Sequence, residues 1–519
     1  MTRGTARHPV ATALLLAAAL LAALAPPASA ASSAPEQVLT QSSFQDFKVA
    51  AEGRWLVFET LLSVDENGNP GPNLAESWEV SDDQLTYTFA LRDGVSFHDG
   101  TPFDAGAAKF SIEFAAAQRP FGRFVEEVEA VDERTLRIQL SRPYWRLLAD
   151  LGVELESKMI SPAAVEPPGA VDGTLERYIG TGPWKLERYV KDQEAVLARN
   201  DEYWDGPPNL AQMIWKTVPD PYTQVLALRG GEVDMVGAAE HHSALPYSEM
   251  AKLLRDPDSY QVEFESYGRY QVIDFNTARV PDVRVRRAFN YAIDRQAMVD
   301  TLFEGLTEPA YLLAPAADEW EWGPQESVEG YGYDPDRAAA LLDEAGWLLE
   351  EGSTIRAKDG QPLTLELLVP FGEANADVVS LFVQAELRKV GVEVRVLTME
   401  SSAASERRAA ADYDLYVHHS CGKATWGCLG LDGKYTTTYT QGGVYATPEL
   451  DRLVEDAFTS AGEADRRAAF DQVWRILHEQ AVGIPLYDIN KPVAYRTGVE
   501  GFRFGPTIFQ MDLRDVEVQ

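Results

Sequence analysis

The spacing of apolar and polar residues predicts both strands and helices along this chain. Polar and apolar residues alternate in 84–89 and 135–140, as expected for strands with one solvent-facing side. Later, the apolar strand 363–369 is followed by a helix with one apolar face up to Val390 and then by an alternating strand at 392–396. A strand, a helix and a strand at this spacing predict a βαβ unit, so the fold class is α/β.

Capping residues sharpen the predicted helix boundaries. Asp282 precedes the helix 283–293, and Asp294 precedes the helix 295–303. An aspartate side chain at this position accepts a hydrogen bond from the free N–H groups of the first turn. Further helices are predicted at 222–229, 334–345 and 465–481 from apolar spacing and from terminal glycine or proline.

The first thirty residues have the pattern of an export signal. Arg3 and Arg7 form a basic start, 10–24 is an apolar run, and Ala28-Ser29-Ala30 offers a small-residue cleavage site. The run is shorter than the roughly 20 residues of a membrane-spanning helix. The only cysteines are Cys421 and Cys428, so none near the cleavage site could carry a lipid anchor. We therefore expect a signal peptide over 1–30 and a periplasmic or secreted protein.

Charge excludes one class of partner. The net charge is −35. A phosphate backbone would be repelled by such a chain, so nucleic-acid binding is not expected. Solubility explains the acidity, and acidity alone is no argument for a metal site.

No arrangement of residues predicts catalysis. The sequence lacks the Gly-x-Ser-x-Gly nucleophile elbow, the His-Glu-x-x-His metal motif and the glycine-rich phosphate loops. Binding without turnover is therefore the leading hypothesis, no cofactor is expected to be required, and a secreted hydrolase is the rival from another class.

The most unusual local cluster is YVHHSCGKATWGC at 416–428. In an oxidising compartment, a disulfide between Cys421 and Cys428 is the favoured interpretation. The segment could instead be an ordinary wall of a cleft, or a thiolate pair that binds a soft metal together with His418 or His419. Because side chains alternate along a strand, the two histidines are expected on opposite faces.

Five strings resemble those of one family, in the expected order. Along the chain they are PNLAESW at 72–78, FALRDGVSFHDGTPFDAGAAKFSIE at 89–113, GTGPW at 180–184, RNDEYW at 199–204 and VRRAFNYAID at 285–294. Together they resemble the family 5 extracellular solute-binding proteins, which are the receptors of ABC importers for peptides and nickel. The resemblance spans nearly all of the chain after about residue 36.

The resemblance implies a fold of two α/β lobes joined by a hinge, with an extra subdomain in the N-terminal half. On this basis, lobe I comprises 31–65, 180–268 and a C-terminal return at 488–519. The extra subdomain is 66–179, and lobe II is 269–487. A monomer is expected, with a membrane permease and a cytoplasmic ATPase as partners.

The resemblance is stronger to the nickel-binding members, through WKTVPDP at 215–221, EAGW at 344–347 and IRAKDGQPL at 355–363. It implies a nickel chelate in the cleft between the lobes, with a short peptide or an opine-like solute as alternatives. The implied site has Arg119 or Arg123 for carboxylates, Trp426 and Tyr435 for packing, and His418 or His419 for the metal. Two departures stand out. A tryptophan expected after the arginine is missing, and the second anionic anchor falls where Lys158 is the only cation.

Overall fold

The computed structural model describes residues 1, 37–153, 157–237, 245–266, 268–314, 322–324, 328–371, 375–419, 444–507 and 510–519. Contacts divide the chain into residues 1–37 and residues 38–519, and the second unit is described below. Three sheets organise it. The hydrophobic clusters that cover them form its cores.

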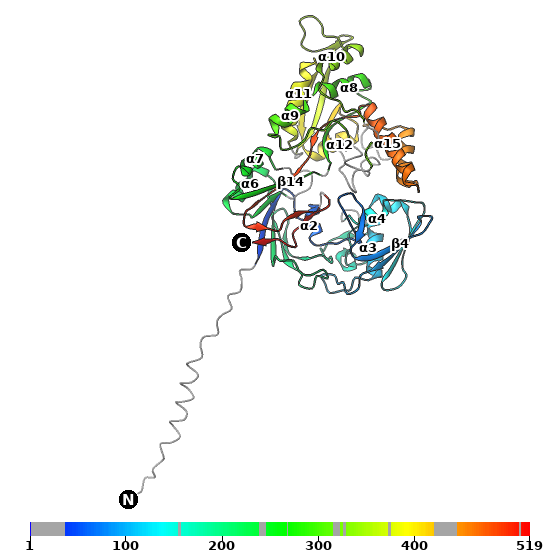
Figure 1. The fold of residues 1–519 in the computed structure, drawn as a ribbon, viewed down its shortest axis with the longest axis vertical. Coiled ribbons are helices and arrows are strands. Elements are labelled where there is room, and N and C mark those ends of the chain that lie inside the picture. The colour runs from blue at the N-terminus through cyan, green and yellow to red at the C-terminus, as the bar shows by residue number, and fades with distance from the viewer. Residues whose placement is uncertain are drawn as a thin grey trace. The chain divides into compact units, whose positions relative to one another are not determined.

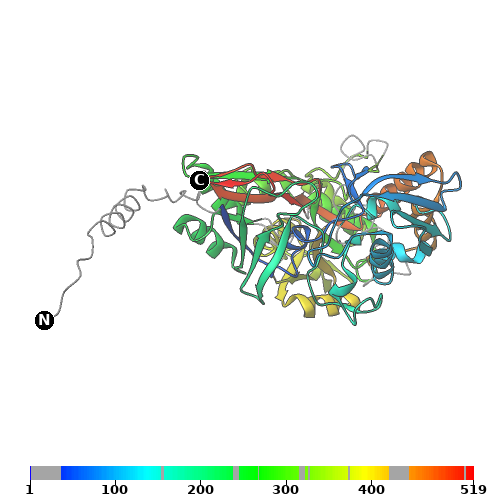
Figure 2. The ribbon, with the colours of Figure 1, turned by 90° about the horizontal axis from the view of Figure 1, so that it is seen from below.

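A seven-stranded mixed sheet contains both the first and some of the last strands of this unit. Its order is β10-β11-β12-β1-β13-β22-β14, and β1 runs parallel to both of its neighbours. The strands are β1 Val38–Ser43, β10 Trp184–Val190, β11 Glu194–Arg199, β12 Gln212–Thr217, β13 Met235–Gly237, β14 Tyr260–Glu265 and β22 Lys491–Arg496. Helices α6 Pro221–Gly230 and α7 Tyr247–Leu254 pack against it, and α2 is Ala51–Trp55. Both views show the C-terminal strands, in red, beside the green segment of β14 (Figures 1 and 2).

A five-stranded sheet and the helices around it form a second part of this unit. Its order is β19-β18-β20-β15-β21, from β15 Tyr270–Phe275, β18 Thr364–Pro370, β19 Glu393–Met399, β20 Leu415–His419 and β21 Gly483–Asp488. Helices α8 Val283–Ala292, α9 Arg295–Leu302, α10 Pro335–Glu344 and α11 Ala376–Lys389 gather around it (Figure 1). Strands β18 and β19 are parallel and joined through α11, so the predicted βαβ unit is confirmed.

A four-stranded antiparallel sheet has the order β4-β5-β7-β6. Its strands are β4 Ala75–Val80, β5 Thr86–Leu91, β6 Val125–Ala130 and β7 Thr135–Leu140, with α3 Ala105–Ala116 and α4 Leu147–Asp150 beside them. Its core continues into α14 Pro448–Thr459 and α15 Glu463–Glu479. The Trp145 indole N–H donates to the carbonyl of Ala457 at 2.9 Å, which ties this sheet to the C-terminal helices.

Short elements complete the described chain. They are η1 Pro120–Phe124, η2 Pro162–Ala164, α12 Ser401–Ala409, β2 Leu62–Val64, β3 Pro70–Pro72, β8 Val165–Glu166, β9 Thr174–Leu175, β16 Ala357–Lys358, β17 Gln361–Pro362, β23 Val499–Glu500, β24 Arg503–Phe504, β25 Met511–Asp512 and β26 Glu517–Val518.

Two adjacent segments connect the seven-stranded and five-stranded sheets. One passes from β14 to β15 and includes Ser266, Gly268 and Arg269, and the other passes from β21 to β22 through 489–490. The Ile489 N–H donates to the Arg269 carbonyl at 2.6 Å, and the Ser266 hydroxyl donates to Asp488. The chain therefore crosses twice between these two sheets, and the two crossing segments are joined by hydrogen bonds.

Local chemistry explains the helix starts. The side chains of Asp104, Asp220, Asp282, Asp294 and Asp334 each accept from a backbone N–H of the first turn of α3, α6, α8, α9 and α10. The predicted caps at Asp282 and Asp294 are thereby confirmed.

Candidate functional site

The carboxyl edge of the five-stranded sheet is the natural place for a ligand. Strands β18, β19 and β20 are parallel, and they end at Pro370, Met399 and His419. In open α/β sheets, ligands bind in the crevice outside the carboxyl ends of the strands. His418 and His419 are the last two residues of β20, so the fold places both imidazoles at this edge.

The two imidazoles lie together, with ring centroids 4.3 Å apart. The expectation that they occupy opposite faces is wrong. Alternation of side chains is imposed by the pleat inside a strand, and β20 ends at His419, so the following backbone no longer fixes the direction of that side chain. A single ligand at this edge can therefore meet both rings.

Two charged side chains, Arg408 and the buried Asp274, lie close to His418. Cross-strand pairing puts Asp274 opposite Tyr416 and Val272 opposite His418, so these residues share one face of the sheet. Arg408 of α12 lies with a guanidinium nitrogen 3.2 Å from Nε2 of His418, and another is 3.9 Å from the Asp274 carboxylate. Arg408 and Asp274 were missed from the sequence. A lone aspartate in the apolar strand 272–276 was the signal that could have found one of them.

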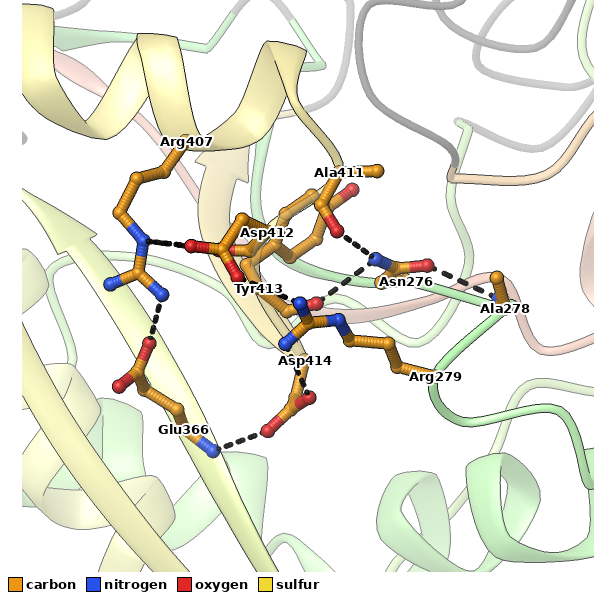
Figure 3. Close-up of polar contacts among 9 residues, drawn as sticks. All are labelled: Asn276, Ala278, Arg279, Glu366, Arg407, Ala411, Asp412, Tyr413 and Asp414. Carbon is orange, nitrogen blue, oxygen red and sulfur yellow. Dashed lines mark hydrogen bonds and ion pairs between the residues drawn. The ribbon is translucent and has the colours of Figure 1, made fainter.

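Ion pairs fix the opposite end of β20 (Figure 3). Asp414 accepts from the Glu366 N–H at 2.9 Å, which joins the start of β20 to β18. Arg407 bonds Glu366 at 2.6 Å and Asp412 at 3.1 Å, and Arg279 bonds Asp412 at 2.7 Å. The consecutive arginines of α12 thus hold β20 at two points along its length.

The two candidate arginines lie on a different element. Arg119 precedes the 3-10 helix η1, and Arg123 lies within it. The guanidinium of Arg123 is 4.7 Å from the centre of the Phe124 ring, which stacks on Tyr144 with centroids 4.2 Å apart. The contact between the Arg123 guanidinium and the Phe124 ring is a cation–π interaction, which restricts the position of the arginine.

Backbone geometry requires a glycine directly before Arg123. A Cβ built on Gly122 would lie 1.8 Å from the carbonyl oxygen of Ala116. The turn from α3 into η1 is so tight that no side chain fits at position 122.

A second region joins the strings at 180–184 and 199–204 to the segment that follows helix α2. Glu59 accepts from the Tyr203 hydroxyl at 2.9 Å and from the Trp204 indole N–H at 3.0 Å. It lines a cavity of about 360 Å³ together with Thr60, whose backbone bridges to Lys158. Lys158, the cation at the predicted anchor for a second anionic group, therefore pairs through its backbone with a residue that lines this cavity.

Burial controls the ionisation of two groups here. Burial raises the pKa of Glu59 to about 7, although hydrogen bonds from Thr181, Trp204 and Tyr203 oppose the shift. Burial lowers the pKa of His98 to about 4, and its Nε2 lies 2.9 Å from the Gly182 carbonyl. An imidazole nitrogen facing a carbonyl oxygen must donate, so His98 is a neutral donor.

Stability is expected to depend on pH through Glu59. Between the ordinary value of 4.5 and about 7, the folded chain holds a proton that the unfolded chain has lost, so this contribution falls as the pH rises. Its full span is about 3 kcal/mol. Glu59→Gln should remove the decline between about pH 5 and pH 8 in thermal unfolding followed by tryptophan fluorescence.

Glu66→Gln removes an exposed carboxyl from the turn between β2 and β3 and serves as the matched control. It should keep the wild-type pH profile. An equal slope in Glu59→Gln and the wild type would contradict the role of Glu59. Neutral His98 contributes in the opposite sense, because stability that depends on it is lost as the pH falls through about 4.

Several predicted residues lie outside the described part of the chain. These are Trp426, Tyr435, Cys421 and Cys428, together with most of the signal segment 1–30. Within the described ranges, no group of three or more His, Cys, Asp or Glu side chains is arranged to hold a metal ion.

Comparisons of the sequence with a family model and with known proteins agree on one family. The model of the bacterial extracellular solute-binding proteins, family 5 Middle, matches residues 69–440. The chain is 28% identical over 475 residues to the nickel-binding periplasmic protein of Escherichia coli (strain K12), with 89% of each chain covered. It is also 28% identical over 480 residues to the glutathione-binding protein GsiB of Salmonella paratyphi A, again with 89% of each covered.

A solved structure supports the same assignment. The NikA protein from Brucella suis, crystallised with Fe(III)-EDTA, superposes with a TM-score of 0.86 at 29% identity, covering 93% of this chain and 100% of that one. This likeness confirms the two-lobe α/β fold expected from the sequence.

Proposed function

Because the chain belongs to family 5 of the bacterial extracellular solute-binding proteins, we propose that its ligand is a chelate of nickel held between the two lobes. Family membership makes the chain a non-enzymatic receptor, the substrate-binding protein of an ABC importer for nickel- or peptide-type ligands. The secreted-hydrolase alternative is thereby set aside.

The imidazole pair at the carboxyl edge of the five-stranded sheet is the observation that carries the choice of ligand. Neutral imidazole is a good ligand for nickel, and β20 ends in two imidazoles whose ring centroids lie 4.3 Å apart. The similarity to a nickel-binding periplasmic protein and to a receptor holding a metal–EDTA complex supports the same choice.

We assign the remaining roles on chemical grounds. Arg119 and Arg123 bind the carboxylates of the chelator, because the planar guanidinium matches a carboxylate with two hydrogen bonds. Trp426 and Tyr435 pack on the chelator. A disulfide between Cys421 and Cys428 closes the loop that carries Trp426.

A short peptide is the second candidate ligand. It is supported by the similarity to a glutathione-binding protein, since glutathione is itself a small peptide with two carboxylates. An opine-like solute has the same carboxylate chemistry, so it belongs with this alternative.

We place lobe I at 31–65, 180–268 and 488–519, the extra subdomain at 66–179, and lobe II at 269–487. The seven-stranded sheet supports the first assignment, because its strands come from each of those three segments. The paired crossings at 266–269 and 489–490 serve as the hinge. A ligand that contacts both lobes favours the closed state.

A relative supports the proposed location, because the similar protein of Escherichia coli is periplasmic. As a separate finding, none of the helices in the described ranges is long and apolar enough to span a bilayer. We propose that 1–30 is removed on export and that the mature monomer delivers its ligand to a permease driven by a cytoplasmic ATPase.

Calorimetry with nickel(II)–L-histidine is the test of this function. The wild type should bind this complex more tightly than it binds dipeptides or tripeptides. The variant Arg119→Gln/Arg123→Gln should bind it about tenfold to a hundredfold less tightly, because charge-assisted hydrogen bonds to carboxylates are lost. Arg255→Gln, with a side chain 67% exposed, is the control and should bind as the wild type does. A dipeptide that binds when no nickel chelate does would make the ligand a peptide.

A further inference from the structure

Trp145 connects two parts of the molecule that are far apart in the sequence. It lies between β7 and α4, and its indole N–H donates to the carbonyl of Ala457 in α14 at 2.9 Å. Both views show α15, in orange, beside the blue segments of the four-stranded sheet (Figures 1 and 2). We propose that Trp145 is a positioning residue, which latches the subdomain 66–179 to lobe II and stabilises the closed arrangement of the lobes. For its lobes and its ligand, this inference rests on the proposed function.

The subdomain holds the backbone on both sides of Trp145. Tyr144 is buried, stacks on Phe124 with ring centroids 4.2 Å apart and donates to Asp150 at 2.6 Å. Arg146 is also buried and donates to the same carboxylate at 2.9 Å. The residues before and after Trp145 are therefore anchored inside the subdomain, while the indole between them reaches α14.

The acceptor of this hydrogen bond lies at a helix end. The last four carbonyl groups of an α-helix have no partner within the helix, and Ala457 belongs to the last turn of α14. Two further side chains of the subdomain reach the same end. The Gln84 amide donates to the Ala461 carbonyl at 3.2 Å, and the Arg142 guanidinium pairs with Glu455. The subdomain therefore supplies three donors to one end of α14.

Aromatic packing adds to these hydrogen bonds. The centre of the Trp145 ring lies 4.5 Å from that of Trp322 and 6.4 Å from that of Phe470 in α15. The guanidinium of Arg466, also in α15, is 5.3 Å from the centre of the Trp145 ring. Aromatic pairs and cation–π contacts stabilise beyond the burial of apolar area. We therefore expect Trp145 to contribute more to this contact than the other two donors.

The two sides of the contact are attached to different lobes. The subdomain is bonded to lobe I, because the Met159 N–H donates to the Glu59 carbonyl at 2.8 Å. Helix α15 is bonded to lobe II, because the guanidinium of Arg286 in α8 donates twice to the Gln480 carbonyl, at 2.9 and 2.8 Å. Rotation of the lobes away from each other therefore has to break the contact. Because the latch consists of protein groups alone, it acts with or without ligand.

Small-angle X-ray scattering of the ligand-free protein tests the latch. Trp145→Ala should have a larger radius of gyration than the wild type, because the closed arrangement loses part of its stabilisation. Trp347→Ala is the matched control, since Trp347 packs partly buried against the core around the five-stranded sheet, and it should scatter as the wild type does. Equal radii for the wild type and Trp145→Ala overturn the inference. A residue that only supports the fold would lower stability and leave the radius unchanged.

Circular dichroism establishes that each variant is folded. If Trp145→Ala does not fold, the variant Gln84→Ala/Arg142→Gln/Trp145→Phe takes its place. This variant removes all three donors but keeps an aromatic ring in the contact. A larger radius than that of the wild type then supports the latch, and an equal radius overturns it.

Calorimetry with nickel(II)–L-histidine measures the effect on binding. Trp145→Ala should bind this complex about fivefold to fiftyfold less tightly, because a smaller fraction of the molecules is closed. An unchanged affinity beside a larger radius overturns the positioning role. If the wild type does not bind nickel(II)–L-histidine, the proposed ligand fails, and scattering still decides whether Trp145 holds the subdomain against lobe II.

Discussion

Replacing Arg295 by methionine is expected to lower the free energy of unfolding by about 3–5 kcal/mol. Arg295 is 1% exposed and donates to the carbonyls of Pro485 at 2.6 Å, Asn290 at 2.9 Å and Tyr331 at 3.1 Å. Burial lowers its pKa to about 10, so it remains charged at neutral pH. Methionine fills similar space but donates to none of these oxygens, and each would be left buried without its donor.

Denaturant unfolding monitored by circular dichroism measures this effect. Arg395→Met is the matched control, because the Arg395 side chain is 74% exposed and approaches Glu393 only at 3.9 Å. It should change stability by less than about 0.5 kcal/mol. If the two substitutions cost the same, the hydrogen bonds of Arg295 do not determine the stability of this lobe.

The second large effect is expected beside the crossing from β21 to β22. Lys491 begins β22 directly after the second crossing, and its ammonium is 2.9 Å from the Glu52 carboxylate of α2. The two side chains are 9% and 0% exposed. Lys491→Met leaves the carboxylate buried without this cation and should cost about 3–5 kcal/mol in thermal or denaturant unfolding.

The double variant Lys491→Met/Glu52→Gln tests the reason for that loss. Removing both charges should restore stability to within about 1 kcal/mol of the wild type, because no isolated charge remains in the interior. A double variant as unstable as Lys491→Met would mean that packing of the lysine stem, and not its charge, stabilises this part of the fold.

Local features of the fold were predictable because their causes are local in sequence. Asp282 and Asp294 cap helices through their own first turns, and the alternation in 135–140 coincides with β7 residue for residue. The βαβ unit around α11 followed for the same reason. Sheet order was not predictable, because no local pattern places β1 between β12 and β13 or brings β22 beside β13.

The candidate site was only partly accessible from the sequence. His418 and His419 stood out as residue types, but the contact between their rings depends on where β20 ends. No pattern in the sequence marks Arg408, because Asp274 comes near it only through the cross-strand pairing of β15 with β20. The same holds for Glu59. Its raised pKa depends on Tyr203 and Trp204, which lie far away in sequence.

The position of β22 in the seven-stranded sheet has a consequence for biosynthesis. This strand, Lys491–Arg496, lies between β13 and β14 and bonds to both. A nascent polypeptide that ends before Lys491 lacks the strand that bonds to both β13 and β14, although β1, β10, β11 and β12 have already been made. The seven-stranded sheet is therefore completed only after β22 has been synthesised, and a chain cut before Lys491 lacks an inner strand of this sheet.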